Sequence, residues 1–183
     1  MDDSALSFPI LHTGRLLLRE LRPADIAQFH RIKYDPAIVS HYYARPKTYA
    51  ESLAKLEALR TDNRTRESLT WCIASIGEPD TLIGTICLWN FRLAEEAAEL
   101  GYELLPEYQR KGIMSEAARG VIAFGFAELG LRLIDAYPNP QNAASCGLLE
   151  RLGFERVGVL EEEEAGEVRK YVRYEMVFEK GKA

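Results

Sequence analysis

Residues 106–117, PEYQRKGIMSEA, join a segment that alternates like a β-strand to a segment that repeats like an α-helix. A helix N-terminus leaves several backbone N–H groups unpaired and carries a partial positive charge. Gly112 lets the main chain approach a ligand closely because glycine has no Cβ, and Arg110 and Lys111 add positive charge nearby. These features predict a binding site for an anion, pyrophosphate above all. The alternative is that both cations are simply solvated.

Length and composition indicate one globular domain, residues 1–183. Hydrophobic residues make up 47% of the chain and charged residues 28%, which is ordinary for a folded protein. No apolar run reaches the roughly 18 residues of a membrane span, and acidic residues stand where a secretory signal would carry cations. The three cysteines lack metal-ligand spacing. A net charge of −5 disfavours a nucleic-acid partner. We therefore expect a cytoplasmic protein that binds neither metal, membrane nor nucleic acid.

Hydrophobic periodicity predicts about seven strands and about four helices in the order β-α-α-β-β-β-α-β-α-β-β. Strands are expected at residues 15–21, 70–76, 82–91, 99–105, 132–137, 154–160 and 168–178. Helices are expected to start near residues 23, 48, 113 and 143. Pro106 should end the strand before the basic turn, since proline offers no N–H to a ladder. Trp71 and Trp89, both within predicted strands, are assigned to the core.

A second motif, PQNAASCGLLERLGF at residues 140–154, opens another predicted helix. It places Asn142 and Ser145 three residues apart in the first turn. Asn142 is interpreted as the N-cap, and an N-cap can also present its side chain to a ligand. The chain carries neither the GxxxxGK[ST] of a P-loop nor the GxGxxG of a dinucleotide site. An anion would therefore bind on a different kind of fold.

Both motifs resemble the GNAT superfamily of N-acetyltransferases. Gln109, Gly112 and Met114 match its acetyl-CoA motif Q/R-x-x-G-x-G/A, with methionine in place of the usual small residue. KGIMSEA is similar to the variant of the RimJ/RimL-type branch. NAASCGLLERLGF is similar to N-x-x-S-x-x-x-x-E-K-x-G-F, and TGRLLLRELRPADI resembles the opening strand and helix of the family. The resemblance covers nearly the whole chain.

The resemblance implies an α+β (mixed α/β) fold with a central, twisted, mixed but mostly antiparallel sheet. It implies that strands 99–105 and 132–137 splay apart and that acetyl-CoA, as co-substrate, places its pantetheine arm in the gap. The residues that the resemblance assigns to the coenzyme are Leu104, Leu105, Gln109, Arg110, Lys111, Gly112, Ile113, Met114, Ser115, Asn142 and Ser145. No metal is implied.

The reaction implied is direct transfer of the acetyl group to a primary amine, so that Cys146 is a small buried residue and not a nucleophile. Ser145 is implied to stabilise or protonate the leaving thiolate. Tyr137 is a rival for this role, with a core aromatic as the alternative interpretation. Glu103 is the candidate base, with a partner for a neighbouring-strand cation as the alternative.

The family's acceptor cleft would be lined by His41, Tyr42 and Tyr43, although hydrophobic packing explains these aromatic residues equally well. The acidic run 161–164 is assigned to an exposed hairpin turn, with attraction of a cationic acceptor as the alternative. An α-amino group, with a pKa near 8, is about a tenth neutral at pH 7, whereas a lysine is neutral in about one molecule in 2,500. An enzyme for N-termini thus needs only a mild base.

The acceptor expected from this argument is a protein or peptide N-terminal amine, as in the RimJ/RimL-type branch. A small-molecule amine acceptor (polyamine, aminoglycoside or amino acid) and a non-catalytic acyl-CoA-binding sensor are the alternatives. Because dimers are frequent in this branch, the resemblance leaves a homodimer open.

Overall fold

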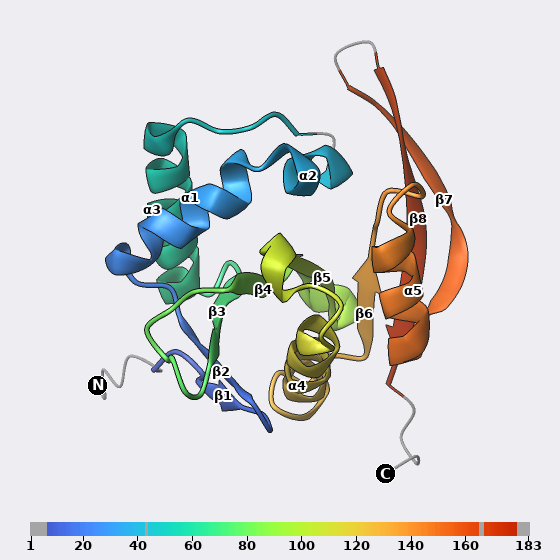
Figure 1. Cartoon of the computed structure of the whole chain (residues 1–183). Helices are drawn as coiled ribbons and strands as arrows, with labels where there is room; N and C mark the ends of the chain where they lie inside the picture. Colours follow the sequence, from blue (N-terminus) through green and yellow to red (C-terminus); the bar gives the residue numbers. More distant parts are fainter. Residues whose placement is uncertain (1–6, 43, 165–166, 179–183) are drawn as a thin grey trace.

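An eight-stranded sheet lies at the centre of the computed structural model, which describes residues 7–42, 44–164 and 167–178 (Figure 1). Its strands lie in the order β1-β2-β3-β4-β5-β6-β8-β7. Neighbours β5 and β6 are parallel, and all other neighbouring pairs among the described strands are antiparallel. The strands are β1 (Leu11–His12), β2 (Leu16–Glu20), β3 (Leu69–Ser75), β4 (Gly84–Arg92), β5 (Ala97–Leu104), β6 (Leu133–Ala136), β7 (Glu155–Glu164) and β8 (Glu167–Val177). The predicted mixed sheet is confirmed.

Five α-helices connect and cover the strands. They are α1 (Ile26–Tyr34), α2 (Pro36–Val39), α3 (Tyr49–Thr65), α4 (Ile113–Ala127) and α5 (Ala143–Leu152). Every predicted strand and helix is present in the predicted order. The additions are β1, which is too short to show a periodicity, and the single turn α2. Asp35 caps α2 by accepting a hydrogen bond from the N–H of Ala37 at 2.8 Å.

The core lies on both faces of the sheet, and β3 is buried on both. Trp71 and Ile73 pack in a cluster with residues of α4, which confirms the core position of Trp71. Cys72 and Ala74 point to the other face and pack with residues of α1 and α3. Beyond these layers, α5 lies against the β7–β8 hairpin (Figure 1).

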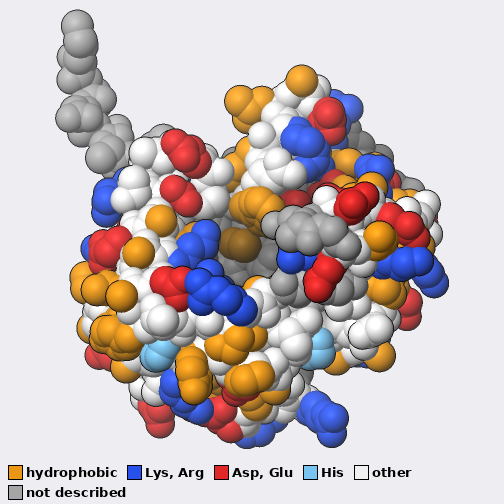
Figure 2. Space-filling view, turned by 90° about the horizontal axis from the view of Figure 1, so that it is seen from above, with side chains coloured by type: hydrophobic (Ala, Val, Ile, Leu, Met, Phe, Trp, Pro, Cys, Tyr) orange, Lys and Arg blue, Asp and Glu red, His pale blue; other side chains and the backbone are white. Residues whose placement is uncertain are grey.

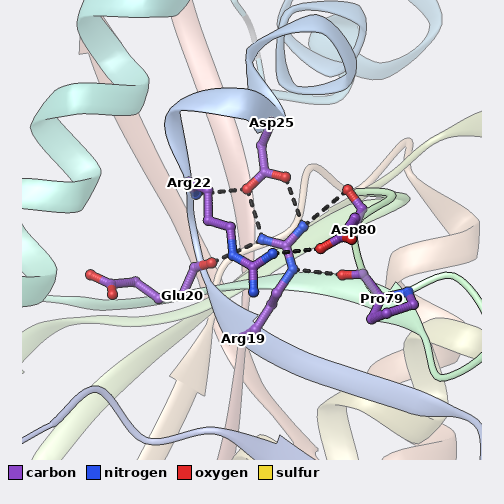
Figure 3. A network of polar contacts seen from close by, with 6 residues as sticks. All are labelled: Arg19, Glu20, Arg22, Asp25, Pro79 and Asp80. Carbon is purple, nitrogen blue, oxygen red and sulfur yellow. Dashed lines mark hydrogen bonds and ion pairs between the residues drawn. The ribbon is translucent and has the colours of Figure 1, made fainter.

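Arg19 on β2 is joined to the start of α1 by a buried ion pair and to the segment before β4 by hydrogen bonds to backbone carbonyls (Figure 3). Its two terminal nitrogens donate to the two carboxylate oxygens of Asp25, at 2.8 and 2.7 Å. The guanidinium also donates to the carbonyl oxygens of Pro79, at 2.8 Å, and Glu20, at 3.0 Å. Asp25 further accepts from the N–H of Arg22 at 2.7 Å. Each side chain is 2% exposed, so these bonds replace those that water would make.

The sheet opens between β5 and β6, as the resemblance implies. Their pairing ends at Glu99 and Asp135, while β5 continues to Leu104. Beyond Glu99 this edge of β5 therefore has no strand partner among the described residues. The opening positions the candidate site.

Among the described residues, none of the helices combines the length and the apolar character that crossing a bilayer requires. A cytoplasmic location and a single domain over all 183 residues stay predictions.

Candidate active site

Two adjoining cavities lie where the sheet opens. The turn cavity, of about 520 Å³, is lined by the starts of α4 and α5 and the end of β5. The hairpin cavity, of about 550 Å³, is lined by β4, β5, the segment after β6 and the β7–β8 hairpin. Residues that line both cavities, and so mark their junction, are His41, Tyr42, Tyr102, Asn142 and Ser145. Figure 2 shows this face of the molecule hollowed in its middle, with hydrophobic side chains at the bottom of the hollow.

The basic turn adopts the backbone conformation that an anion site needs. Arg110 and Gly112 both have positive φ, +59° and +74°, and Gly112 is the N-cap of α4. This left-handed region is unfavourable for residues with a Cβ, which is why glycine suits the cap. The amides of the first turn of α4 thereby face the turn cavity, which Ile113 and Ser115 line.

Glu116 holds the basic turn against the N-terminal strands. Its carboxylate accepts from Thr13 Oγ1 at 2.5 Å and from the backbone N–H and Nε of Arg15, both at 2.8 Å. Arg15 in turn donates to the carbonyl oxygen of Lys111 at 3.3 Å. The turn is therefore held in place by residues about 100 positions away in the chain.

Most residues that the resemblance assigned to the coenzyme line the turn cavity. They are Leu104, Gln109, Arg110, Gly112, Ile113, Met114, Ser115, Asn142 and Ser145. Leu105 lies outside, because it is 1% exposed and its N–H donates to Ile83 O at 3.0 Å. Lys111 also lies outside, with Nζ 5.7 Å from the centre of the Tyr108 ring. Arg151, which the sequence did not single out, adds a second cation to the lining.

A pair of hydroxyl groups stands at the junction of the two cavities. Asn142 caps α5, as predicted, by accepting from the N–H of Ser145 at 3.1 Å. The Ser145 Oγ lies 2.7 Å from the Tyr102 hydroxyl. Burial raises the pKa of Tyr102 to about 12, so this hydroxyl keeps its proton at neutral pH. Sequence reasoning assigned no role to the Tyr102 side chain; its alternation on β5 was the available signal.

Glu103 lies in the lining of the turn cavity, where a cation already holds it. Its carboxylate forms an ion pair with Lys33 Nζ, and the two side chains are 13% and 15% exposed. Thr85 Oγ1 donates to the same carboxylate at 3.4 Å. The structure thus favours the alternative interpretation, although the cation comes from α1 and not from a neighbouring strand.

Tyr137 lines the hairpin cavity and is half-buried, which differs from a core aromatic. Its hydroxyl donates to Asp135 Oδ2 at 3.2 Å. Burial, followed by the charge of Asp135, raises the pKa of Tyr137. Its proton is thus directed to Asp135, whereas the Ser145 hydroxyl stands at the junction of the cavities.

Glu99 is the carboxylate of the hairpin cavity that sequence reasoning missed. Burial raises the pKa of Glu99 to about 7, although the Asn90 side chain donates to it at 3.5 Å. A group with this pKa can exchange protons at neutral pH. From the alternation of β5 alone, Glu99 looks like an ordinary half-exposed strand residue. The burial that raises its pKa comes from neighbouring strands, which the local sequence does not show.

The remaining acceptor predictions have different outcomes. Tyr42 lies at the junction and donates its hydroxyl proton to the carbonyl oxygen of Tyr102. His41 lines both cavities, and Tyr43 lies outside the described residues.

The core assignment of Trp89 is wrong, because this side chain is 45% exposed and lines the hairpin cavity. A strand residue is buried only where another layer covers that face.

The acidic run lies on an exposed hairpin, as predicted. Residues 161–164 form the end of β7 and pair with β8, and residues 161–163 are exposed. Glu162 lines the hairpin cavity, together with Tyr171 and Arg173 of β8. The cavity therefore has charges of both signs in its wall.

The groups that line the turn cavity suit acetyl-CoA. The amide N–H groups at the start of α4 can donate hydrogen bonds to a diphosphate, and Arg110 and Arg151 lie in the same wall. The open edge of β5 offers hydrogen-bonding groups to an extended amide chain. In the described residues, no three His, Cys, Asp or Glu side chains are grouped to hold a metal ion.

Comparisons with known proteins agree with this geometry. A model of the acetyltransferase (GNAT) domain family matches residues 15–155. The uncharacterized N-acetyltransferase YoaA of Bacillus subtilis is 34% identical over 158 residues, which are 84% of this chain and 86% of that protein. The spermidine N(1)-acetyltransferase of Vibrio cholerae is 27% identical over 154 residues, 82% of this chain and 84% of that protein.

A similar solved structure is RimL, the ribosomal L7/L12 alpha-N-protein acetyltransferase, in complex with coenzyme A. It has a TM-score of 0.78 at 18% identity, and the match covers 92% of this chain and 98% of that one. At this identity the likeness shows the fold. The chain therefore belongs to the GNAT family of acetyltransferases and is an acetyl-CoA-dependent N-acetyltransferase.

Proposed function

We propose that this enzyme acetylates the α-amino group of a protein or peptide N-terminus, as a member of the RimJ/RimL-type branch. The observation that carries the proposal is Glu99, a carboxyl with a pKa of about 7 in the wall of the hairpin cavity. Acetyl-CoA binds in the turn cavity, and the acceptor amine enters through the hairpin cavity. The thioester and the amine then meet at the junction, beside Tyr102 and Ser145.

Glu99 is the base that takes a proton from the amine. Moving a proton from an α-amino group, of pKa near 8, to this carboxyl is uphill by on the order of 1 kcal/mol. From a lysine-like amine, of pKa near 10.4, the same transfer is uphill by over 4 kcal/mol. The base is therefore matched to an N-terminal amine. Glu103 as base stays a prediction, and its ion pair with Lys33 makes it the weaker candidate.

The proton balance at the junction uses two hydroxyl groups. A bond forms between the amine nitrogen and the acetyl carbon, and the bond from that carbon to sulfur breaks. Before attack the ammonium proton passes to Glu99 and leaves to solvent through the open hairpin cavity. When the bond to sulfur breaks, the nitrogen loses a second proton to the pair of hydroxyls formed by Tyr102 and Ser145, which lie 2.7 Å apart, and the Ser145 hydroxyl donates a proton to the thiolate. The hydroxyl pair therefore ends with both of its protons. Tyr137 as the acid stays a prediction.

The walls of the hairpin cavity support a peptide over a polyamine. Tyr42, Trp89 and Leu160 line it with side chains that are more than 40% exposed, 44%, 45% and 43%, and these can contact an apolar residue. RimL acts on a protein α-amine, whereas the relative from Vibrio cholerae acts on spermidine, so the relatives leave the acceptor open. A homodimer stays a prediction.

Release of coenzyme A thiol, measured for a panel of acceptors, tests the proposal. The panel contains a peptide with a free N-terminus, the same peptide with a blocked N-terminus and a free lysine, spermidine, and a free amino acid. We expect turnover with the first peptide and little with the others. Turnover with spermidine or the amino acid alone would select the small-molecule alternative. Tight binding of acetyl-CoA without release from any acceptor would select the sensor.

Glu99→Gln tests the base within the same assay. We expect kcat to fall about 10²–10⁴-fold with the folded state retained, and the rise of activity through about pH 7 to disappear. Two peptides whose α-amino pKa values differ show whether the limb of the pH profile reports Glu99 or the acceptor amine. A limb that belongs to Glu99 stays at the same pH when the peptide is changed. Unchanged turnover of Glu99→Gln, with the limb intact, would refute this base.

A further inference from the structure

Glu99 and Asp135 lie beside each other at the point where β5 and β6 part. They are the last register partners of this parallel pair. Register partners in a parallel sheet point their side chains to the same face. Glu99 is in the lining of the hairpin cavity, whereas Asp135 is 1% exposed and outside that lining. Glu99 can thus contact an acceptor in the cavity, whereas Asp135, beside it on the next strand, cannot.

Asp135 is paired on one side only. Arg92 Nη2 donates to its Oδ2 at 2.6 Å, and the Tyr137 hydroxyl donates to the same oxygen at 3.2 Å. Oδ1 of Asp135 is buried and has no hydrogen-bond partner among the described residues. Arg92 also shares its charge with Glu95, whose carboxylate lies 3.1 Å from its Nε. The charge of Asp135 is therefore incompletely neutralised.

Charged and titratable groups face Glu99 from several elements. These are Arg92 of β4, Asp135 of β6 and Tyr137 after it, Glu162 of β7, Arg173 of β8, and His41 across the same cavity, while Glu175 of β8 acts on Asp135. Arg173 and Glu175 form an ion pair with each other. With that pair counted as neutral, the charge of Arg92 is shared by three carboxylates of this cluster, namely Glu99, Asp135 and Glu162. The arrangement favours retention of a proton by one of them.

The direction of the pKa shifts agrees with this count. Burial is the largest cause that raises the pKa of Glu99, and the charge of Asp135 raises it further. Arg92 acts in the opposite direction on both carboxyls, since it lowers the pKa of Glu99 and of Asp135. Asp135 and Arg92 therefore shift the pKa of Glu99 in opposite directions.

We propose that Asp135 is a positioning residue for the transfer: its charge, partly neutralised by Arg92, sets the pH at which Glu99 can take the proton of the acceptor amine. The inference rests on the proposed role of Glu99 as base. Asp135 itself touches neither substrate. Its side chain acts across the sheet, and the proton that Glu99 takes leaves through the open hairpin cavity.

The test compares Asp135→Asn with Arg92→Gln in the whole enzyme, using thiol release from pH 5 to 9. Removal of the Asp135 charge should move the acid limb of the kcat profile to lower pH by at least about half a unit. Loss of Arg92 should move the same limb to higher pH by a similar amount. A general loosening of the site lowers activity in both variants without moving the limb in opposite directions.

Glu95→Gln is the matched control, because Glu95 also pairs with Arg92 but is exposed. Its limb should stay within about 0.2 pH units of the unmodified enzyme, since exposed charges are screened by water. Limbs that stay in place in Asp135→Asn and Arg92→Gln, while Glu99→Gln loses the limb, would overturn the inference and leave the proposed function standing. A limb retained in Glu99→Gln would instead refute the base itself. If Asp135→Asn does not fold, Arg92→Gln decides alone: an upward shift supports the inference and an unmoved limb contradicts it.

Discussion

Asp25 and Asp135 are both buried and both paired with an arginine, yet their surroundings differ. Both oxygens of Asp25 are bound by Arg19, and a backbone N–H adds a further bond (Figure 3). Asp135 binds Arg92 through one oxygen, and its other oxygen has no partner among the described residues. The side chain of Arg19 is 2% exposed and that of Arg92 is 25% exposed.

The difference separates a structural ion pair from an electrostatically active one. A pair whose oxygens and N–H groups are all satisfied presents little field to its neighbours and holds β2 to the start of α1. An incompletely satisfied pair leaves charge that a nearby carboxyl can feel, and Glu99 is that carboxyl. Satisfaction of the hydrogen bonds, more than burial, thus distinguishes the two regions.

The largest expected effect comes from Asp25→Asn, which leaves Arg19 as an uncompensated buried charge. We expect the free energy of unfolding to fall by about 3–5 kcal/mol, with kcat per folded molecule unchanged. Urea denaturation followed by circular dichroism measures it. Asp80→Asn is the control, because the Asp80 side chain is 85% exposed in its ion pair with Arg22 and should cost about 0–1 kcal/mol. Equal losses in both variants would break the comparison.

Next in size is Ser145→Ala, a change in the cleft. We expect kcat to fall about 10–100-fold, below the upper range for general acids because a thiolate leaves easily. The free energy of unfolding should change little, since Ser145 is half-buried and bonded to one hydroxyl. Ser115→Ala, in the turn cavity, is the matched control and should alter the KM for acetyl-CoA rather than kcat. Identical kinetics of both variants would remove Ser145 from the chemistry.

Asp135→Asn sharpens the comparison with Asp25→Asn directly. We expect a loss of only about 1–2 kcal/mol in the free energy of unfolding, because Arg92 is partly exposed and keeps Glu95 as a partner. The same urea titration measures it. A loss as large as that of Asp25→Asn would show that incomplete pairing does not distinguish the two regions.

The smallest expected effect is that of Gly112→Ala. An added Cβ would meet Arg15 Nη2 at 3.6 Å, an ordinary contact, so the cost comes from φ of +74° and should be about 1 kcal/mol. We also expect acetyl-CoA to bind several-fold more weakly in calorimetric titration, since the Cβ stands beside the amides of the turn. Gly130→Ala, with φ of +68° and open space around it, should cost similar stability and leave acetyl-CoA binding unchanged. Equal affinities of the two variants for acetyl-CoA would show that Gly112 does not lie beside the bound coenzyme.

Local patterns predicted the elements and the glycine turn at the start of α4 successfully because both depend on neighbours in the chain. The turn consists of contiguous residues around Gly112, and a helix N-terminus presents amides whatever else surrounds it. The predictions failed where another layer decides the outcome. Trp89 is exposed because it points away from the face of β4 on which Leu88 packs with residues of α4. Glu103 meets Lys33 because α1 brings this lysine to it.

The sequence by itself therefore determined the order of strands and helices, the family resemblance and the basic glycine turn before α4. Only the tertiary structure decided which carboxyl lies partly buried in a cavity wall beside a second carboxylate, and so which one we propose as the base. Glu99 and Asp135 are 36 positions apart and meet only because β5 and β6 pair in parallel. Burial and Coulomb interactions depend on distances in space, and these exist only once the strands are side by side.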